Sequence, residues 1–516
     1  MKHLLNLLLF ILLTNIVSFS QNSEAPEKYI LTPPASLKPR LNNPLVYGCR
    51  PGRDFLYRIP CQGKRPVTFT AKGLPPSLRL DKKTGIITGT SPAKGTYNVT
   101  LTAKNQKGRS VKSFKIISGD KIGLTPPMGW NHWYAYYDKP TDKLIRQVAD
   151  VMLTTGLADA GYDYICIDDC WTNAHKNNKM NPQDTLRKGT RRDPQGNILP
   201  NAYFPDMKNM TDYLHTRGFK AGIYSSPAKV TCAGFEGSFG HEEQDAKQWA
   251  TWGFDLIKYD RCTYPDDAPY GTLAEVKEPY VKIGDALKKI NRDIYYSLCQ
   301  YYGSEKDGDV WKWGSSIGGN SWRTGTDINA FLPDVFKVAL RHAEFAQYQR
   351  PGEWNDPDFL MLGWIGDRKN NTTHPVKMHP NTQYAYVSLW SLMAAPLFFS
   401  SRIDKMDAFT LNLLTNPEII AINQDPLGQC GKVIMQGNNQ FLMVKDLYDG
   451  SKAVGFFNRE KKPVTMTASW EQIGVTGKQK LRDAWRMKNL GTFKNEFTSD
   501  IPAEGCMVII LQNKSF

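Results

Sequence analysis

Between about residue 124 and residue 424, continuous apolar runs alternate with stretches of helical periodicity. The apolar runs include YDYICIDD, FKAGIY, FDLIKYD, DIYYSLCQ and APLFFSS, and two of the helical stretches are DKLIRQVADVMLTTGLADAG and AEVKEPYVKIGDALKKI. Strands that are apolar throughout are buried on both faces, and their alternation with helices is typical of a parallel sheet. About 300 residues with close to eight such units predict a (β/α)8 TIM barrel over 124–424. No glycine-rich phosphate turn follows a strand, which argues against a doubly wound fold.

The two flanks of this region show the short, alternating strands of antiparallel β-domains. Over 51–119 the strands are VTFTA, GIITGT, YNVTLTA and VKSFKII. They predict a small N-terminal β-sandwich that resembles immunoglobulin-like (Ig-like) domains, for which a spacer or scaffold role is favoured over glycan binding. Over 425–516 the strands KVIMQ, FLMVKDL, KAVGFFN, VTMTASW, KLRDAWR and GCMVIIL predict a C-terminal antiparallel β-sandwich.

The first 20 residues have the pattern of a secretory signal peptide. One lysine precedes the apolar run LLNLLLFILL, and small residues follow it. A membrane anchor is the alternative, but Asn6, Thr14 and Asn15 interrupt the apolar stretch. We therefore expect export through a cleaved signal peptide into the periplasm or out of the cell, and no membrane span. Residues 21–50 are rich in Pro, Asn and Ser and predict a linker or extended arm.

Composition narrows the function classes. The 516 residues are 41% hydrophobic and 22% charged, which fits a folded multidomain protein. The net charge is +15, but the basic residues are spread along the chain, so no nucleic-acid partner is expected. Nine cysteines and eight histidines show no zinc spacing and no HExxH motif, so no metal site is expected. The sequence leaves the oligomeric state open.

Acidic residues cluster where the predicted barrel strands end. In such a barrel the carboxyl ends of the strands carry the active site. These ends and the segments after them hold Asp168, Asp169, Asp260, Asp327, Asp356 and Asp358. Tryptophan and tyrosine residues accompany them. Carboxylates accept hydrogen bonds from hydroxyl groups and aromatic rings pack on apolar faces, so this combination suits a sugar.

Two of these carboxylates are candidates for glycosidic chemistry. Lys258 and Asp260 are two apart on one strand and therefore point the same way, and the lysine would keep Asp260 ionised as a nucleophile. Taken alone, a salt bridge at a strand end is the simpler interpretation of this pair. Asp327, with Arg323 four residues before it, is the candidate proton donor, although a helix cap or an arginine partner explains it equally well.

Eight motifs in order along the chain carry a family resemblance. They are PPMGWNHW, YICIDDCW, FPDMKNMTDYLHTRGFKAGIY, TCAGFEGSFG, WGFDLIKYDRC, WRTGTDI, EWNDPDFLMLG and AINQDPLG. Their order and spacing resemble glycoside hydrolase family 27, the α-galactosidase and α-N-acetylgalactosaminidase family, from about residue 124 through the C-terminal β-domain. The resemblance implies a retaining exo-glycosidase that removes terminal α-linked galactose without a cofactor.

Carried over position by position, the resemblance assigns the reacting groups and one side of the sugar site. It implies Asp260 as the nucleophile and Asp327 as the acid/base. Asp168 and Asp169 would accept hydrogen bonds from the O4 and O6 side of galactose, and Lys258 would contact O3 and O4.

The remaining implied roles concern the walls and the rim. Trp133 and Tyr224 would wall the pocket, Arg323 would contact the 2-substituent, and Asp358 would complete the rim. A disulfide between Cys232 and Cys262 would lie next to the nucleophile strand. Cys170 is expected to be free, because HWYAYYDKPTD lacks the cysteine that pairs with its equivalent in many animal members.

Gln300 departs from the family pattern, which has glutamate or serine at this position. Its amide can bond either a 2-hydroxyl group or an acetamide carbonyl. The sequence therefore keeps α-N-acetylgalactosaminidase as an alternative to α-galactosidase. A β-L-arabinopyranosidase is a further alternative, against which the galactose-type pair Asp168 and Asp169 argues. A catalytically silent glycan-binding protein is the alternative from another class, and the presence of Asp260, Asp327 and Lys258 speaks against it.

Overall fold

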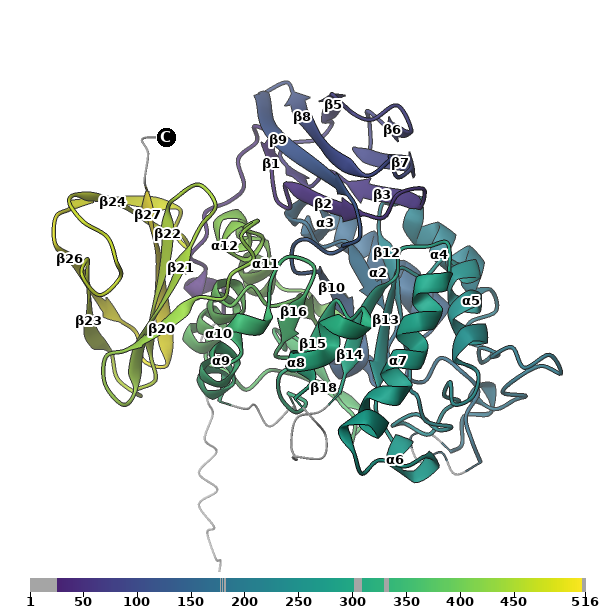
Figure 1. Cartoon of the computed structure of the whole chain (residues 1–516). Coiled ribbons are helices and arrows are strands. Elements are labelled where there is room, and N and C mark those ends of the chain that lie inside the picture. Colours follow the sequence, from purple (N-terminus) through teal and green to yellow (C-terminus); the bar gives the residue numbers. More distant parts are fainter. Residues whose placement is uncertain are drawn as a thin grey trace, which may run out of the picture.

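A computed structural model describes residues 26–176, 178, 180, 182–300, 309–328 and 334–512. The chain forms a central barrel with one β-domain at its end and another along its side (Figure 1). The predicted signal peptide, 1–20, lies outside the described residues. Within the described ranges, no helix is both long and apolar enough to cross a membrane.

The central domain is a (β/α)8 barrel, as predicted. Eight parallel strands follow one another around it, and hydrogen bonds from Leu360 N to Phe398 O (2.7 Å) and from Ser400 N to Leu360 O (2.9 Å) close the ring. In order, the strands are β10 (Met128–Asn131), β11 (Tyr164–Cys166), β12 (Lys220–Ser225), β13 (Leu256–Asp260), β14 (Tyr295–Cys299), β15 (Ser321–Arg323), β16 (Trp354–Asp356) and β19 (Leu397–Phe399). These strands are almost wholly buried, which explains their continuous apolar runs.

Helices surround the barrel and follow the predicted periodicity. The predicted helix at 274–290 is α7, whereas the stretch at 142–161 divides into α2 and α3. The division falls at Gly156, whose φ of 85° lies in the left-handed region and ends the first helix. The α-helices are α1 (Trp133–Tyr136), α2 (Asp142–Thr154), α3 (Leu157–Ala160), α4 (Met207–His215), α5 (Glu242–Trp252), α6 (Tyr264–Asp267), α7 (Leu273–Lys289), α8 (Val310–Trp313), α9 (Val335–Ala343), α10 (Pro380–Leu392), α11 (Ala408–Thr415) and α12 (Pro417–Asn423). Short 3-10 helices occur at Pro26–Tyr29, Thr185–Arg187, Gly314–Ile317, Ala346–Tyr348 and Ile403–Lys405, and a hairpin of β17 (Trp364–Asp367) and β18 (Thr372–Pro375) follows β16.

The N-terminal domain is the predicted Ig-like sandwich with a core of its own. One sheet has the strand order β2-β9-β8-β5, a second has β3-β7-β6, and β1 pairs with β4. Tyr57 stacks on Phe114 between the sheets, with ring centroids 4.6 Å apart. The strands are β1 (Arg40–Leu41), β2 (Val46–Cys49), β3 (Asp54–Arg58), β4 (Cys61–Gln62), β5 (Thr68–Lys72), β6 (Leu78–Leu80), β7 (Ile86–Thr90), β8 (Gly95–Asn105) and β9 (Gly108–Ser118).

The arm predicted over 21–50 is only partly an arm. β1 and β2 lie inside this range. β2 pairs in parallel with β9, which is the last strand of the domain along the chain. Short strands whose partners lie far along the chain leave no local pattern, so the sequence did not reveal them. The residues before β1 do run along the barrel: Leu31 N donates to Tyr384 Oη (2.9 Å), and Asn416 Nδ2 donates to Thr32 Oγ1 (2.8 Å).

The C-terminal domain is an antiparallel β-sandwich, as predicted. A six-stranded sheet of order β20-β21-β22-β27-β24-β25 packs on the pair β23-β26. Phe441, Phe457 and Trp485 belong to the core of the barrel, so the two domains share one hydrophobic core. The strands are β20 (Lys432–Met435), β21 (Gln440–Asp446), β22 (Lys452–Asn458), β23 (Val464–Ser469), β24 (Gln479–Asp483), β25 (Lys488–Phe493), β26 (Glu496–Ile501) and β27 (Gly505–Gln512).

The Ig-like domain packs against the amino-terminal end of the barrel. Arg58 Nη2 lies 3.4 Å from Asp159 Oδ1, and Arg50 Nε lies 2.5 Å from Asp293 Oδ1. Asp159 and Asp293 precede the barrel strands β11 and β14. Because these residues come before the strands, the domain lies at the end of the barrel opposite to the strands' carboxyl ends.

Candidate active site

The carboxyl ends of the barrel strands bring together nearly all of the predicted site residues. Asp168 and Asp169 follow β11, Tyr224 lies in β12, and Lys258 and Asp260 lie in β13. Arg323 ends β15, Asp327 follows it, and Asp358 follows β16. This convergence is the position of active sites in barrels of this type.

Asp260, the predicted nucleophile, is a buried carboxylate with one oxygen available. Its side chain is 4% exposed, and Tyr224 Oη donates to its Oδ2 at 3.2 Å. Its Oδ1 has no hydrogen-bond partner among the described residues. Burial raises the pKa of Asp260 to about 6; the charge of Lys258 opposes this rise, while the charge of Asp327 adds to it. At neutral pH the group is therefore mostly ionised, with Oδ1 free to act as a nucleophile.

Lys258 does not pair with Asp260 as expected. Its Nζ lies 2.8 Å from Asp168 Oδ2, two strands away around the barrel. The prediction that this lysine holds the nucleophile in its charged form is therefore only partly right. Lys258 does lower the pKa of Asp260, but the cost of burying a carboxylate is larger and the net direction is upward.

Asp168 accepts three hydrogen bonds inside the site. Its Oδ2 accepts from Lys258 Nζ and from Asn131 Nδ2 (3.0 Å), and its Oδ1 accepts from Asp169 N (3.0 Å). Burial is the largest single influence and favours the neutral form, but the charges of Lys258 and His132 and the hydrogen bonds from Lys258 and the Asp169 N–H together outweigh it, so the pKa of Asp168 is lowered. The backbone N–H of Asp168 donates to His132 Nδ1 (2.8 Å), which fixes the start of this turn. Asp168 therefore remains ionised and can accept hydrogen bonds from sugar hydroxyl groups.

Arg323 joins two carboxylates on the other side of the site. Its Nη1 lies 3.1 Å from Asp327 Oδ1, and its Nη2 lies 3.1 Å from Asp358 Oδ2. Asp358 is 2% exposed, whereas the side chain of Asp327 is half exposed. Asp358 also accepts from Tyr134 Oη (2.9 Å), and its burial raises its pKa to about 6. Asp327 is thus the more solvent-exposed of the two carboxylates that Arg323 joins.

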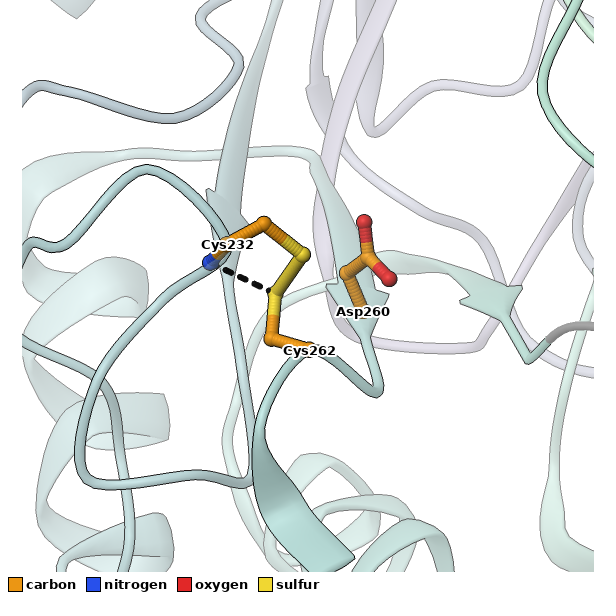
Figure 2. A group of neighbouring side chains, drawn as sticks. All are labelled: Cys232, Asp260 and Cys262. Carbon is orange, nitrogen blue, oxygen red and sulfur yellow. Dashed lines mark hydrogen bonds between the residues drawn. A yellow bond between two sulfur atoms is a disulfide. The ribbon is translucent and has the colours of Figure 1, made fainter. Parts of the chain in front are cut away.

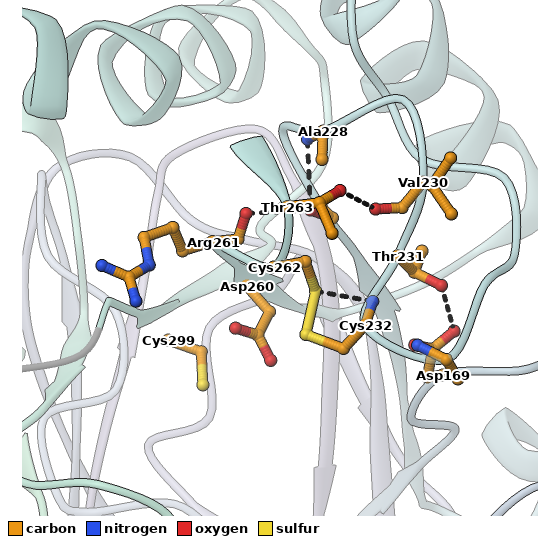
Figure 3. The surroundings of a disulfide bond; sticks show 12 residues. Asp169, Ala228, Val230, Thr231, Cys232, Asp260, Arg261, Cys262, Thr263 and Cys299 are labelled. Carbon is orange, nitrogen blue, oxygen red and sulfur yellow. Dashed lines mark hydrogen bonds between the residues drawn. A yellow bond between two sulfur atoms is a disulfide. The ribbon is translucent and has the colours of Figure 1, made fainter. Parts of the chain in front are cut away.

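Asp169 bonds to the loop that carries Cys232. Its Oδ1 accepts from Thr231 Oγ1 at 2.8 Å (Figure 3). Its Oδ2 accepts from Ala233 N at 2.9 Å, so Asp169 bonds to both neighbours of the cysteine. Burial raises the pKa of Asp169 to about 7. The resemblance implied a sugar contact for this residue. Its bonds in this structure give it a positioning role toward the loop as well.

Cys232 and Cys262 pair beside the nucleophile. Their Cα atoms are 4.8 Å apart, and Figure 2 shows the carboxylate of Asp260 next to the two sulfur atoms. Tyr224 Oη lies 3.0 Å from Cys262 Sγ, so this hydroxyl group touches both the cysteine pair and the nucleophile. Cys232, Asp260 and Cys262 are close enough to form a metal cluster, but sulfur atoms joined to each other are not thiolate ligands. Cys170 is free, as expected.

Aromatic rings enclose the ammonium group of Lys258. The centroid of the Tyr224 ring lies 5.1 Å from Lys258 Nζ, and that of the Phe359 ring lies 5.2 Å from it. Trp133, the predicted wall residue, is half buried at the start of α1. Tyr134 and Phe359 were not among the predicted site residues. Tyr134 directly follows the motif PPMGWNHW and Phe359 lies inside the motif EWNDPDFLMLG, which was the available signal.

Gln300 is the predicted site residue whose amide bonds to two tyrosines. It is fully buried; Tyr280 Oη donates to its Oε1 (2.9 Å), and its Nε2 donates to Tyr270 Oη (2.9 Å). These bonds use its Oε1 and one of the two N–H donors of its Nε2, so a contact with a 2-hydroxyl or acetamide group would have to share the amide with the two tyrosines. Two tyrosines already use both ends of the amide, a pairing that spacing along the chain does not disclose.

Four of the eight non-glycine residues with positive φ among the described residues lie at this end of the barrel. Tyr137, Cys170, Cys262 and Asp358 all have positive φ values, between 45° and 88°, although none is glycine. Such residues cost free energy and gather where function requires a fixed geometry.

Comparison with known proteins agrees with this geometry. The model of the α-galactosidase A family matches residues 125–425, that of the α-galactosidase C-terminal β-sandwich domain matches 437–511, and an Ig-domain model matches 38–118. The α-galactosidase of Cyamopsis tetragonoloba is 36% identical over 423 residues, which cover 80% of this chain and 93% of the relative.

Two crystal structures extend the likeness to three dimensions. A Bacteroides fragilis protein assigned as an α-galactosidase superposes with a TM-score of 0.83 at 36% identity, over 93% of this chain and 98% of its own. The α-galactosidase I of Mortierella vinacea superposes with a TM-score of 0.66 at 29% identity, over 76% of this chain and 98% of its own. The chain therefore belongs to the α-galactosidase family, glycoside hydrolase family 27.

Proposed function

We propose that this protein is a retaining exo-glycosidase that hydrolyses terminal α-linked galactose. The observation that carries the proposal is the unpartnered Oδ1 of Asp260 at the end of β13, with the Arg323–Asp327 pair close enough for the charge of Asp327 to raise the pKa of Asp260. A nucleophilic carboxylate and a solvent-facing acid are the two groups that double displacement requires. The sequence relatives named as α-galactosidases support the same substrate.

In the first step, Asp260 Oδ1 attacks the anomeric carbon of the galactosyl unit. The bond from that carbon to the leaving oxygen breaks, and Asp327 transfers its proton to this oxygen. The product is a galactosyl ester of Asp260 and a free alcohol. In the second step, Asp327 takes a proton from water, the water oxygen attacks the anomeric carbon, and the ester bond to Asp260 breaks. Two inversions at one carbon give net retention.

The other charged side chains orient the sugar. Asp168, held by Lys258 at 2.8 Å, offers carboxylate oxygens to the hydroxyl groups on the O4 and O6 side. The ammonium group of Lys258 carries further donors toward O3 and O4. Arg323 is assigned to the 2-substituent and Asp358 to the rim, while Trp133 and Tyr224 provide the walls.

The α-N-acetylgalactosaminidase alternative loses its main argument. Gln300 was the residue that kept an acetamide contact open, and both ends of its amide are bonded to tyrosines. A β-L-arabinopyranosidase remains disfavoured by the pair Asp168 and Asp169. A catalytically silent glycan-binding protein has no need for an ionised, unpartnered carboxylate beside a half-exposed one.

We also propose that the chain is exported through a cleaved signal peptide over 1–20. Disulfides persist in oxidising compartments such as the periplasm and the outside of the cell. The pairing of Cys232 with Cys262 supports such a destination, and we propose that the two form a disulfide there.

The direct test compares p-nitrophenol release from the α-galactoside, the α-N-acetylgalactosaminide and the β-L-arabinopyranoside. The purified mature protein should favour the α-galactoside, and the Asp260→Ala variant should lose this activity. Preference for either of the other sugars would replace the substrate assignment. Full activity of the variant would refute the nucleophile assignment.

A further inference from the structure

The net charge of the chain resides in the Ig-like domain. Residues 38–118 hold 17 lysine and arginine residues, two aspartates and no glutamate. The rest of the chain holds equal numbers of basic and acidic residues, so this domain accounts for the whole net charge of +15. The basic residues are therefore not spread evenly along the chain, contrary to the expectation from the sequence. The mechanism above gives this charge no role.

Contacts with the barrel use the basic residues on one side of the domain. Arg50 Nε lies 2.5 Å from Asp293 Oδ1, and Arg58 and Arg65 both lie within 3.4 Å of Asp159 Oδ1. Figure 1 shows β2 and β3 next to the barrel and β5 and β8 on the side of the domain away from it. The basic residues near β5 and β8 thus lie away from these acidic residues of the barrel.

Exposed basic residues gather where β8 turns into β9. Lys104, near the end of β8, lies directly opposite Arg109, near the start of β9, and Lys107 lies in the turn between them. Asn105 Nδ2 donates to the carbonyl oxygen of Lys64 (2.8 Å), which brings this lysine to the same end of the sheet. The basic patch consists of Lys38, Lys64, Lys104, Lys107 and Arg109.

Lys38 belongs to the basic patch because its side chain runs across the turn. A Cβ at Gly108 would lie 3.0 Å from Lys38 Cε, so the glycine leaves room for the lysine. The backbone N–H of Lys64 donates to the carbonyl oxygen of Leu37 (3.0 Å), which fixes the neighbouring segment. Three segments that are far apart along the chain therefore build one basic surface.

The basic patch has no acidic partner within the described residues. Both aspartates of the domain are engaged elsewhere: Asp54 Oδ2 lies 3.3 Å from Arg292 Nη1 of the barrel, and Asp81 Oδ1 accepts from two backbone N–H groups of its own turn. Like charges directly opposite each other in a β-ladder are destabilising. The opposition of Lys104 and Arg109 therefore has a cost in the free protein, which a bound anion relieves.

The side chains beside the basic patch carry hydroxyl groups. Thr68 on β5 lies opposite Lys104, and Thr70, Thr100 and Thr102 occupy the next outward positions of β5 and β8. Hydroxyl groups bond to sugar hydroxyls, while ammonium and guanidinium groups bond to carboxylates. An open sheet face with both kinds of group suits an extended polymer that carries carboxylates and hydroxyl groups.

Other polyanions fit this surface less well. The bases of single-stranded nucleic acids stack on exposed aromatic rings, and no tyrosine or phenylalanine ring of residues 38–118 is exposed. Peripheral binding to a lipid surface uses an apolar face, and over 37–118 only Leu37 and Val111 are large apolar side chains with high exposure. The chemistry of the surface therefore favours an acidic polysaccharide.

We propose that the basic patch docks this protein on a polysaccharide that carries carboxylate groups along its chain. The Ig-like domain covers the amino-terminal end of the barrel, so docking there leaves the active site at the opposite end uncovered. This adds a targeting role to the spacer or scaffold role expected for the domain. The inference goes beyond the proposed function, and only the choice of a polysaccharide over other polyanions rests on it.

The test measures binding of the full-length mature protein to surfaces coated with alginate, a carboxylate polysaccharide without galactose, and with neutral dextran. Surface plasmon resonance should detect binding to alginate alone, and this binding should weaken as the salt concentration rises. In the Lys104→Gln/Arg109→Gln variant, Kd for alginate should rise about tenfold. The Lys64→Gln/Lys107→Gln variant changes a loop and a turn instead of paired strand positions and should show a similar rise.

The matched control removes the same charge from another domain. Lys461 and Lys462 are exposed in the loop between β22 and β23, and the Lys461→Gln/Lys462→Gln variant should bind alginate as the wild type does. All three variants should retain wild-type activity on p-nitrophenyl α-galactoside. An equal rise of Kd in the control would overturn the basic patch, because net charge alone would then explain the binding.

Three other results would also overturn the inference. They are no binding of the wild type to alginate, equal binding to dextran, and tighter binding to single-stranded DNA or to vesicles of equimolar phosphatidylcholine and phosphatidylglycerol. None of these measurements requires turnover. If the wild type cleaves no α-galactoside, the proposed function fails, and the binding data still decide the role of the basic patch.

Discussion

The ammonium group of Lys258 lies 2.8 Å from Asp168 Oδ2, and both side chains are largely buried, at 16% and 3% exposure. The carboxylates Asp168 and Asp260 differ in ionisation, because only Asp168 forms an ion pair with this lysine. Asp168 remains firmly ionised as a sugar acceptor, while Asp260 retains a pKa of about 6 and an oxygen without a hydrogen-bond partner. In the proposed mechanism, these properties suit Asp260 to nucleophilic attack, because its charge is buried and only partly compensated.

Replacing Lys258 with methionine should damage both binding and stability. Removal of one partner leaves the buried charge of Asp168 uncompensated, which costs about 3–5 kcal/mol in comparable pairs. We expect the free energy of unfolding to fall by about this amount and kcat/KM for the α-galactoside to fall about 100-fold or more. Denaturant titration and steady-state kinetics measure the two effects.

The control for this prediction is Lys282→Met, which removes a surface ion pair of similar length. Lys282 lies 2.9 Å from Glu278 on α7, and both side chains are about half exposed. Exposed pairs contribute about 1 kcal/mol or less. A loss of stability in Lys258→Met no larger than that in Lys282→Met would contradict the account of the buried pair.

The acid side of the pH profile should report Asp260. The carboxylate must be ionised to attack, and its raised pKa means that it is protonated as the pH falls through about 6. The kcat/KM for the α-galactoside should therefore decline below about pH 6. In Lys258→Met the decline should begin at higher pH, because this lysine lowers the pKa of Asp260. A profile that stays flat down to pH 4 would contradict the assignment.

The same shifts predict an opposite effect on stability. The folded pKa values of Asp169 (about 7) and Asp260 (about 6) lie above the unfolded value of about 4. Their contribution to the free energy of unfolding is thus fully present below about pH 4 and is lost as the pH rises through 6 to 7. In the Asp169→Asn variant, the part of this pH dependence that Asp169 contributes should be absent. Denaturant titrations of the variant and the wild type at several pH values between about 4 and 7 measure the difference.

Asp327→Ala should separate acid catalysis from nucleophilic attack. A leaving group that needs no protonation, such as dinitrophenolate, should retain much of its rate of glycosylation, whereas an unactivated galactoside should lose about 100-fold or more. Pre-steady-state kinetics on the two substrates measure the difference. An equal loss for both, with the fold intact by circular dichroism, would count against Asp327 as the acid.

Removal of the cysteine pair should lower both stability and turnover. A crosslink that closes a loop of about 30 residues contributes about 3–4 kcal/mol in the chain-entropy description. Cys262 Sγ also lies 3.0 Å from the hydroxyl group of Tyr224, which in turn bonds to Asp260. The variant with serine at 232 and 262 should unfold at lower denaturant and lose about tenfold in kcat. The variant Cys430→Ser, which removes a free cysteine, is the control and should behave as the wild type.

Much of the architecture was predictable because it is written in local patterns. Buried parallel strands appear as apolar runs, and acidic residues at their ends identified the face of the barrel that carries Asp168 and Asp260. Strand β2 was missed, because its partner β9 is far away along the chain, at the end of the same domain. The break at Gly156 between α2 and α3 was also missed, because helical periodicity continues across it.

The contacts within the site were less predictable, because they join residues far apart along the chain. Lys258 and Asp260 are two apart on β13, which suggested that the lysine pairs with Asp260, but the lysine bonds to Asp168 two strands away around the barrel. Gln300 follows β14 as expected, but the hydroxyl groups of Tyr270 and Tyr280, outside the barrel strands, bond to its amide.

The central claim is that Asp260 forms a covalent bond to galactose. Incubation with a mechanism-based fluorinated α-galactosyl donor, followed by proteolysis and peptide mass spectrometry, tests it most directly. The account predicts one added fluorogalactosyl unit on the peptide that contains Asp260, with loss of activity in proportion to labelling. An active enzyme that acquires no label, or a label on another carboxylate, would contradict the account.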